Sequence, residues 1–223
     1  MKMTVRTLAG LVLVGLIAVS CSKKPPKEPQ TDYDPYEEIK EKPVEKEPEP
    51  PPPPKCESLD EECKGKEDSW VAVGEVAEFQ PPVDWLYAKL ENMGVTLADG
   101  KAAAIAYRVA DGPVNPKKDF KGAVAALQPV FEAVHAEVPE SLMKKVFRKA
   151  PVVDDGGALA LNTWQLERDK GLKVDGEQGV VIAVTATVGE DKVIVGAVAF
   201  KAATLKDNLE AVQKSYRTVR GAQ

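Results

Sequence analysis

The chain has 223 residues, of which 43% are hydrophobic, and a formal net charge of −5 at pH 7. This length is enough for one domain with a sizeable core. Residues 69–223 carry 19 basic and 20 acidic side chains, so the composition excludes a nucleic-acid-binding protein that depends on strong net positive charge, and we expect no nucleic-acid partner.

The first twenty residues have the layout of a signal peptide. Lys2 and Arg6 give a short basic start, and residues 8–19 are apolar or small without a charge. A membrane-spanning helix takes about 20 apolar residues, so this stretch is too short to cross a bilayer. We therefore expect residues 1–20 to be cleaved from the mature protein.

Residues 17–21, IAVSC, resemble the lipobox of bacterial lipoproteins. The resemblance implies cleavage before Cys21 and acylation of that cysteine, and two or three acyl chains make a durable membrane anchor. Because Ser22 is not aspartate, the same resemblance favours the outer membrane, on its periplasmic face or at the cell surface. The alternative is an ordinary signal peptide that leaves Cys21 as a free thiol.

The segment from Ser22 to about Lys55 is rich in proline, glutamate and lysine and nearly free of apolar residues. Such a composition cannot bury enough surface to offset its ordering entropy, so we expect a disordered tether. Its prolines favour polyproline II, a semi-rigid spacer that rises roughly 3.1 Å per residue. The run PEPPPPP at 48–54 is alternatively a polyproline ligand for an aromatic groove.

Cys56 and Cys63 end the tether, which with Cys21 and the small cysteine loop occupies residues 21–68. Outside the cytoplasm two nearby cysteines tend to pair, so we expect a disulfide that contributes about 2 kcal/mol in the chain-entropy model. A metal site and free thiols are the alternatives. The acidic residues between the cysteines lack the order of a calcium loop, and the spacing is not that of a zinc site. We expect no metal and no cofactor.

The folded domain is predicted over residues 69–223, and its first elements are strands. Residues 70–79 and 85–90 give weak strand patterns, and residues 101–109 give a stronger one. An apolar stripe at helical spacing over 119–135 then predicts a helix that is either kinked at Pro129 or split there. Pro139 opens a second helix over 140–148.

The second half of the domain begins with a strand over 158–167. Its apolar phase changes between Leu161 and Trp164, which predicts a bulge around Asn162-Thr163. Residues 179–189 and 192–200 form the clearest pattern, an apolar hairpin that turns at Glu190-Asp191. Residues 205–219 form an amphipathic helix, for which Thr204 is the expected N-cap.

This order of strands, helices, strands and a final helix predicts an α+β fold, an antiparallel sheet packed by helices in a two- or three-layer sandwich. The order over about 150 residues resembles that of the PsbP/Mog1-like folds, to which several bacterial lipoproteins belong. That resemblance implies a binding or assembly-accessory domain rather than an enzyme.

The sequence offers little for catalysis. His135, the only histidine, ends an apolar helix stripe, where interaction with the helix dipole explains it better than a role as a base. The run Asp154–Gly157, DDGG, fits a turn that tolerates positive φ better than a phosphate or metal loop. No GxSxG elbow or glycine-rich phosphate motif is present in the sequence.

Aromatic side chains are the remaining candidates for a functional surface. Trp70, Trp85, Tyr87 and Trp164 are large and few, and such residues serve either as core or as the centre of an interface. We expect Trp85, Tyr87 and Trp164 to be the possible ligand or partner surface. The sequence thus predicts a lipid-anchored, non-catalytic envelope protein that binds a partner protein, and alternatively a periplasmic carrier of a small apolar or carbohydrate ligand.

Overall fold

The computed structural model of the protein describes residues 54–223. The predicted signal peptide, Cys21 and the proline-rich segment up to residue 53 lie outside the described residues. Residues Pro51–Gln223 form one compact unit. Its two hydrophobic cores and its disulfide are built from residues between Cys56 and Val219, so the unit holds within itself the packing that it needs to fold.

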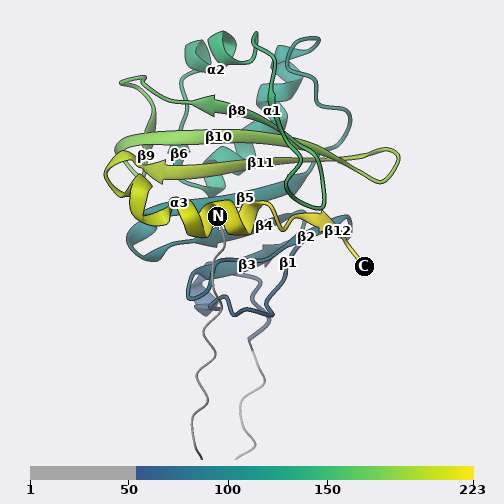
Figure 1. Ribbon diagram of the computed structural model, residues 1–223, viewed down its shortest axis with the longest axis vertical. Helices are drawn as coiled ribbons and strands as arrows, with labels where there is room; N and C mark the ends of the chain where they lie inside the picture. Colours follow the sequence, from purple (N-terminus) through teal and green to yellow (C-terminus); the bar gives the residue numbers. More distant parts are fainter. Residues whose placement is uncertain (1–53) are drawn as a thin grey trace, which may run out of the picture. The chain divides into compact units, whose positions relative to one another are not determined.

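The centre of the unit is an antiparallel sheet with the strand order β3-β4-β5-β11-β10-β8-β7 (Figure 1). Its strands are β3 (Leu86–Leu90), β4 (Met93–Leu97), β5 (Ala103–Val109), β7 (Val152–Asp154), β8 (Leu161–Leu166), β10 (Glu177–Val188) and β11 (Lys192–Lys201). The short strands β6 (Ala136–Glu137) and β9 (Lys173–Val174) pair with each other, and β9 also pairs with the start of β10. A second sheet, ordered β1-β2-β12, consists of β1 (Val71–Val73), β2 (Ala77–Phe79) and β12 (Arg220–Gly221).

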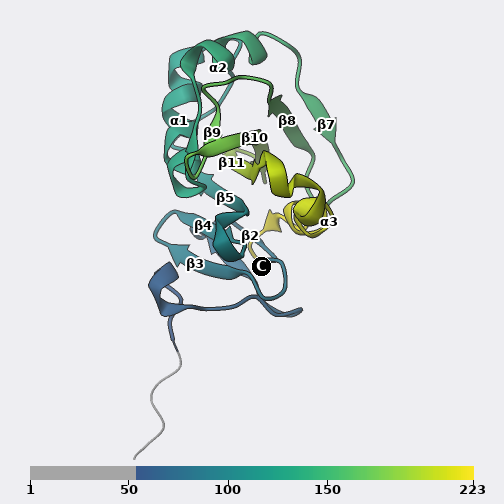
Figure 2. The ribbon, with the colours of Figure 1, turned by 90° about the vertical axis from the view of Figure 1, so that its left-hand side faces the viewer.

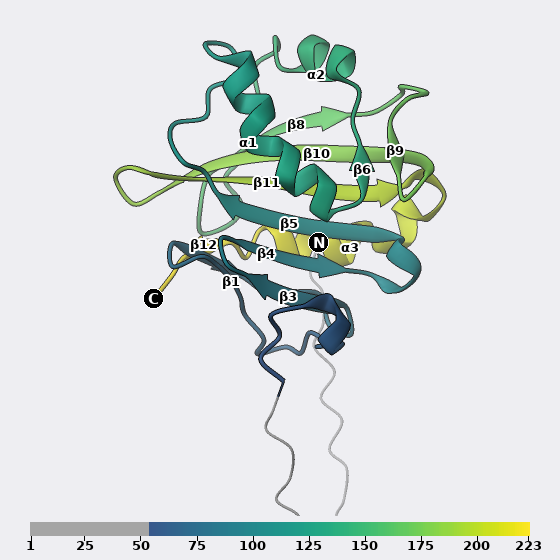
Figure 3. The same cartoon turned by 180° about the vertical axis from the view of Figure 1, so that it is seen from behind.

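Both faces of the central sheet are covered, as Figures 2 and 3 show from the side and from behind. Helices α1 (Phe120–Ala133) and α2 (Glu140–Val146) cover one face, and α3 (Leu205–Tyr216) and the second sheet cover the other. Single 3-10 turns are η1 (Leu59–Glu61), η2 (Asp99–Lys101) and η3 (Ala202–Thr204). The expected class, an α+β fold with an antiparallel sheet packed by helices, is confirmed for this unit.

Strand β5 shows how one sheet serves two cores. Successive side chains of a strand point to opposite faces. Ala104 and Ala106 therefore lie in the core beneath α1, where their small size lets the helix approach, while Ile105 and Tyr107 lie in the core beneath α3. Because both faces are buried, the central strands are apolar throughout, which is why residues 179–200 were recognisable as a hairpin.

Tyr107 occupies a space that two glycines leave open. In the register of the sheet Tyr107 stands between Gly94 of β4 and Gly196 of β11. Its ring meets Phe79 edge-on with 5.2 Å between centroids, and its hydroxyl donates a hydrogen bond to the Tyr216 carbonyl at 3.1 Å. Burial raises the pKa of this phenol far above its ordinary value. Tyr107 thus ties the central sheet to the end of α3.

Several local predictions need correction. Residues 70–79 form two strands, β1 and β2, that turn back at Gly74, whose φ is +56°. Of the two alternatives at Pro129, the structure has the single helix, α1, which contains the proline and is not split there. Thr204 does stand at the N-cap of α3, but its hydroxyl donates to the Ala102 carbonyl at 2.9 Å and caps no helix N–H. Strand β4 was not expected.

The bulge predicted at Asn162-Thr163 is absent from β8. The strand pairs without interruption with β10 on one side and with β7 on the other. The change of apolar phase has another cause, since Leu161 lies in the core beneath α3 whereas Trp164 and Leu166 lie in the core beneath α1 and α2. When both faces of a strand are buried, its apolar side chains can change from one face to the other along the strand without an inserted residue.

Residues 54–68, which we predicted to belong to the segment of the tether and cysteine loop, pack against the edge of the central sheet. Cys56 and Cys63 form a disulfide with 5.7 Å between their Cα atoms. The Lys89 N–H donates to the Cys56 carbonyl at 2.7 Å and the Tyr87 N–H donates to the Cys63 carbonyl at 2.9 Å. The cysteine loop therefore covers the exposed edge of β3, which would otherwise offer unpaired backbone groups to other chains.

Candidate binding surface

The three aromatic residues predicted as a ligand surface are not brought together. Trp85 and Tyr87 pack in the core beneath α3, and the Tyr87 hydroxyl lies 3.5 Å from the Cys56 sulfur. Trp164 lies on the opposite face of the sheet, 6% exposed, with its ring edge-on to Phe147 at 5.5 Å. Its Nε1 atom has no hydrogen-bond partner in the described region. The fourth aromatic, Trp70, lies under the Arg220 guanidinium at 3.6 Å.

His135 follows the end of α1 in a left-handed backbone conformation, with φ of 54°. Its side chain is exposed, and its carbonyl accepts a hydrogen bond from the Asp175 N–H at 2.8 Å. Within residues 54–223, no group of three or more His, Cys, Asp or Glu side chains is placed to hold a metal ion.

The Asp154–Gly157 turn is held against the end of α3. Asp154 accepts hydrogen bonds from the Tyr216 hydroxyl, from the Gly156 N–H at 3.1 Å and from the Arg217 Nε at 3.0 Å. These contacts, that from Tyr216 foremost, lower the pKa of the Asp154 carboxyl below its ordinary value. Neither glycine has the positive φ that was expected. A Cβ on Gly157 would lie 2.2 Å from the Arg217 carbonyl oxygen. The turn and the backbone of Arg217 are therefore too close for any residue with a side chain at this position.

The Asp154 contacts predict a pH-dependent contribution to stability. A carboxyl whose pKa is lower in the folded state stabilises the fold above its unfolded pKa, near 3.8, and this contribution is lost as the pH falls through the folded value. Asp154→Asn is expected to lower the free energy of unfolding at pH 7 by about 1 to 2 kcal/mol. Urea denaturation should show this difference shrinking below pH 4. Asp155→Asn, at an exposed neighbour, is the control, and an equal effect of both substitutions would contradict the assignment.

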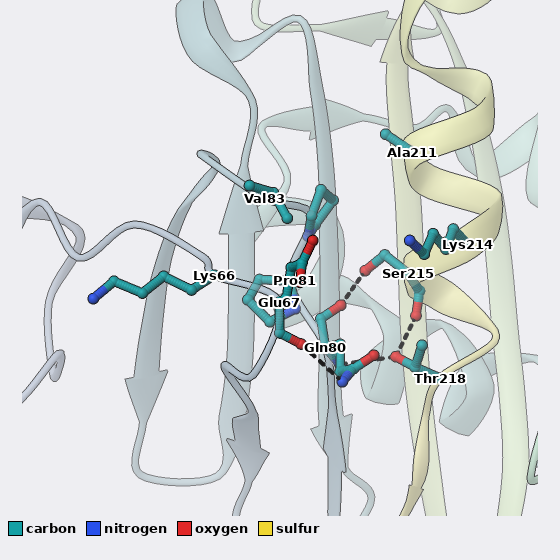
Figure 4. Close-up of a pocket in the computed structure, with 10 residues that line it drawn as sticks. Lys66, Glu67, Gln80, Pro81, Val83, Ala211, Lys214, Ser215 and Thr218 are labelled. Atoms are coloured by element: carbon teal, nitrogen blue, oxygen red, sulfur yellow. Dashed lines mark hydrogen bonds between the residues drawn. The ribbon is translucent and has the colours of Figure 1, made fainter. Parts of the chain in front are cut away.

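A surface groove of 540 Å³ lies between the β2–β3 loop and α3 (Figure 4). We call it the seam groove. Three parts of the chain line it: the segment after the cysteine loop, the β2–β3 loop, and one side of α3 with the turn that follows. The residues are Lys66, Glu67, Gln80, Pro81, Pro82, Val83, Ala211, Lys214, Ser215 and Thr218.

The wall of the seam groove is fixed by hydrogen bonds at both backbone groups of Gln80. Its N–H donates to the Thr218 hydroxyl at 2.8 Å, and its carbonyl accepts from the Ser215 hydroxyl, which is 3% exposed. Thr218 in turn donates to the Ser215 carbonyl at 2.6 Å. The loop is thereby locked onto α3, and a preformed wall of this kind loses little entropy when a ligand binds.

The floor and rim of the seam groove differ in chemistry. Pro81 and Pro82 are buried, whereas Val83 is 52% exposed, one of the largest exposures of an apolar side chain in the described region. Lys66 and Lys214 add two positive charges and Glu67 one negative charge. An apolar centre with a polar, charged rim is the pattern of a protein-binding surface. Sequence reasoning missed it because residues 66–83 and residues 211–218, which form it, lie far apart in the chain.

No protein-family model matches the chain, and no curated protein is similar to it. No helix in residues 54–223 has both the length and the apolar character that crossing a bilayer requires.

Proposed function

We propose that the protein is a lipid-anchored cell-envelope protein whose folded unit binds a partner protein without catalysing a reaction. Cys21 carries the lipid, the proline-rich segment sets the reach, and anchoring raises the local concentration of the unit near its partner. The element order that resembles PsbP/Mog1-like domains also supports a binding or assembly role.

The observation that carries this proposal is the seam groove. It combines a rigid wall, an exposed Val83 and a rim of charges. The carrier alternative needed a cavity lined by Trp85, Tyr87 or Trp164. None of these three lines any of five surface concavities in residues 54–223, the seam groove among them, so the groove favours a protein partner.

Crosslinking in intact cells, followed by affinity purification and mass spectrometry, tests the proposal. The full chain is compared with an anchored chain that lacks residues 54–223, because the cysteine loop belongs to the folded unit. A partner that is recovered only with the full chain is the expected result. Recovery of the same neighbours with the anchored segment alone would contradict a binding role for the unit.

A charge in the groove should remove the same partner. Burying a valine side chain contributes about 1.5 to 3 kcal/mol, so Val83→Asp is expected to weaken binding roughly tenfold or more. Leu209→Asp places the same charge at another exposed apolar residue, outside the groove, and should leave binding unchanged.

A further inference from the structure

Five cationic side chains from two separate segments meet in a second surface concavity, of 660 Å³. Lys117, Lys118 and Lys121 come from the approach to α1 and its first turn. Lys144 and Arg148 come from α2 and the turn that follows it. All five are exposed, and together we call them the basic groove.

The positive charge of the basic groove is not neutralised within the described region. Asp119, whose carboxylate caps α1 by accepting a hydrogen bond from the Gly122 N–H at 2.9 Å, also lines the groove, so one negative charge stands against five positive ones. None of the five cations forms an ion pair with residues 54–223. The ion pairs in the described region involve other cations, namely Lys101, Arg108, Arg168, Lys201, Arg217 and Arg220. The groove therefore attracts an anionic partner.

Two exposed valines follow the basic groove in the chain. Val152 is 71% exposed and Val153 is 58% exposed, and they lie on β7, the edge strand of the central sheet. Successive side chains of a strand point to opposite faces. Val153 pairs with Asn162 and so lies on the face of the sheet that carries Trp164 and α2, whereas Val152 lies on the other face. Figure 2 shows β7 running from the turn after α2 along the side of the unit. A soluble polyanion such as nucleic acid makes no use of exposed valines. A bilayer surface uses both features, cations for its headgroups and apolar side chains for its interface.

The basic groove lies at a position from which it can contact a surface other than the membrane to which the N-terminal side of the chain is proposed to be attached. The cysteine loop, near the start of the described residues, lies at one end of the unit, and α2 lies at the opposite end (Figure 1). A unit held through its N-terminal side thus presents the basic groove away from that attachment.

From these observations we propose that the basic groove and Val153 bind the surface of an anionic phospholipid bilayer. This contact is separate from the seam groove and requires no lipid on Cys21. It goes beyond the proposed function because it gives the folded unit a membrane contact of its own.

Flotation of residues 51–223 with vesicles tests the proposal, after circular dichroism has shown a cooperative unfolding transition. Binding is expected to vesicles that contain phosphatidylglycerol and not to pure phosphatidylcholine, and it should fall as salt screens the charges. Each cation near an anionic surface contributes about fivefold to partitioning, so K144E/R148E should weaken binding roughly 30-fold or more. V153S should weaken it several-fold, whereas V152S, on the opposite face of β7, should weaken it less.

The control K192E/K206E makes the same change of net charge at two exposed lysines outside the groove and should bind nearly as the wild type does. Equal losses in both charge variants would overturn the proposal, because they would show a response to net charge alone. Failure to float with anionic vesicles, together with groove-dependent binding to polyglutamate or an oligonucleotide, would instead assign the groove to a soluble polyanion.

Discussion

Replacing Gly196 with valine is expected to lower the free energy of unfolding by about 3 kcal/mol or more, a large part of the stability of an ordinary domain. A Cβ at this position would lie 2.5 Å from Cδ1 of Tyr107 and 3.0 Å from the Ala106 carbonyl oxygen. The Tyr107 ring cannot move aside freely, since Phe79 lies against it and its hydroxyl is bonded to the end of α3. Urea denaturation measures the effect.

Gly112→Val is the matched control, because a Cβ there meets nothing within 4 Å and the residue has no positive φ. It should change stability by no more than about 0.5 kcal/mol. The double variant Tyr107→Ala/Gly196→Val should be less destabilised than the sum of the single variants, since the valine fills space that the ring has left. Full additivity would contradict direct packing of Tyr107 on Gly196.

Replacing Cys21 with serine is expected to move the protein from the membrane fraction to the soluble fraction. If the lipobox interpretation is right, the acyl chains are the durable anchor, at roughly 0.8 kcal/mol for each buried methylene. Fractionation of cells that express the full chain, followed by immunoblotting, measures the shift.

Ser22→Asp is the companion variant, because the lipoprotein resemblance implies that aspartate after the cysteine retains a protein in the inner membrane. The Ser22→Asp protein should stay membrane-bound but fractionate with the inner membrane instead of the outer membrane. A Cys21→Ser protein that still fractionates quantitatively with the outer membrane would show that the lipid is not what holds it there.

The elements with strong local patterns were predictable. The hairpin β10–β11 combines long β-branched runs with a turn at Glu190-Asp191, and α3 has a clear amphipathic stripe. Strand β4 was missed because Gly94 interrupts its apolar pattern. The structure explains that glycine, since a Cβ there would lie within 3 Å of Val71 and Phe79 in the sheet that packs above it. The packing of the second sheet on β4 requires a glycine at this position, and that glycine interrupts the apolar pattern by which the strand would have been recognised. A single sequence does not show such packing.

Both candidate surfaces escaped prediction for a similar reason. The charges of the basic groove come from segments more than twenty residues apart, and the near-neutral total for residues 69–223 concealed their concentration at one end of the unit. The seam groove joins residues that are more than a hundred positions apart. The aromatic residues, in contrast, stood out in the sequence because of their size, yet they serve mainly as core.

Site-specific photocrosslinking in intact cells tests the central claim most directly. A photoreactive phenylalanine analogue is placed at Val83 in the seam groove and, separately, at Leu209 on α3 outside it. We predict a light-dependent adduct with one envelope protein from position 83 and none from position 209. No adduct from position 83, or the same adducts at equal yield from both positions, would contradict the assignment of the seam groove as the partner-binding site.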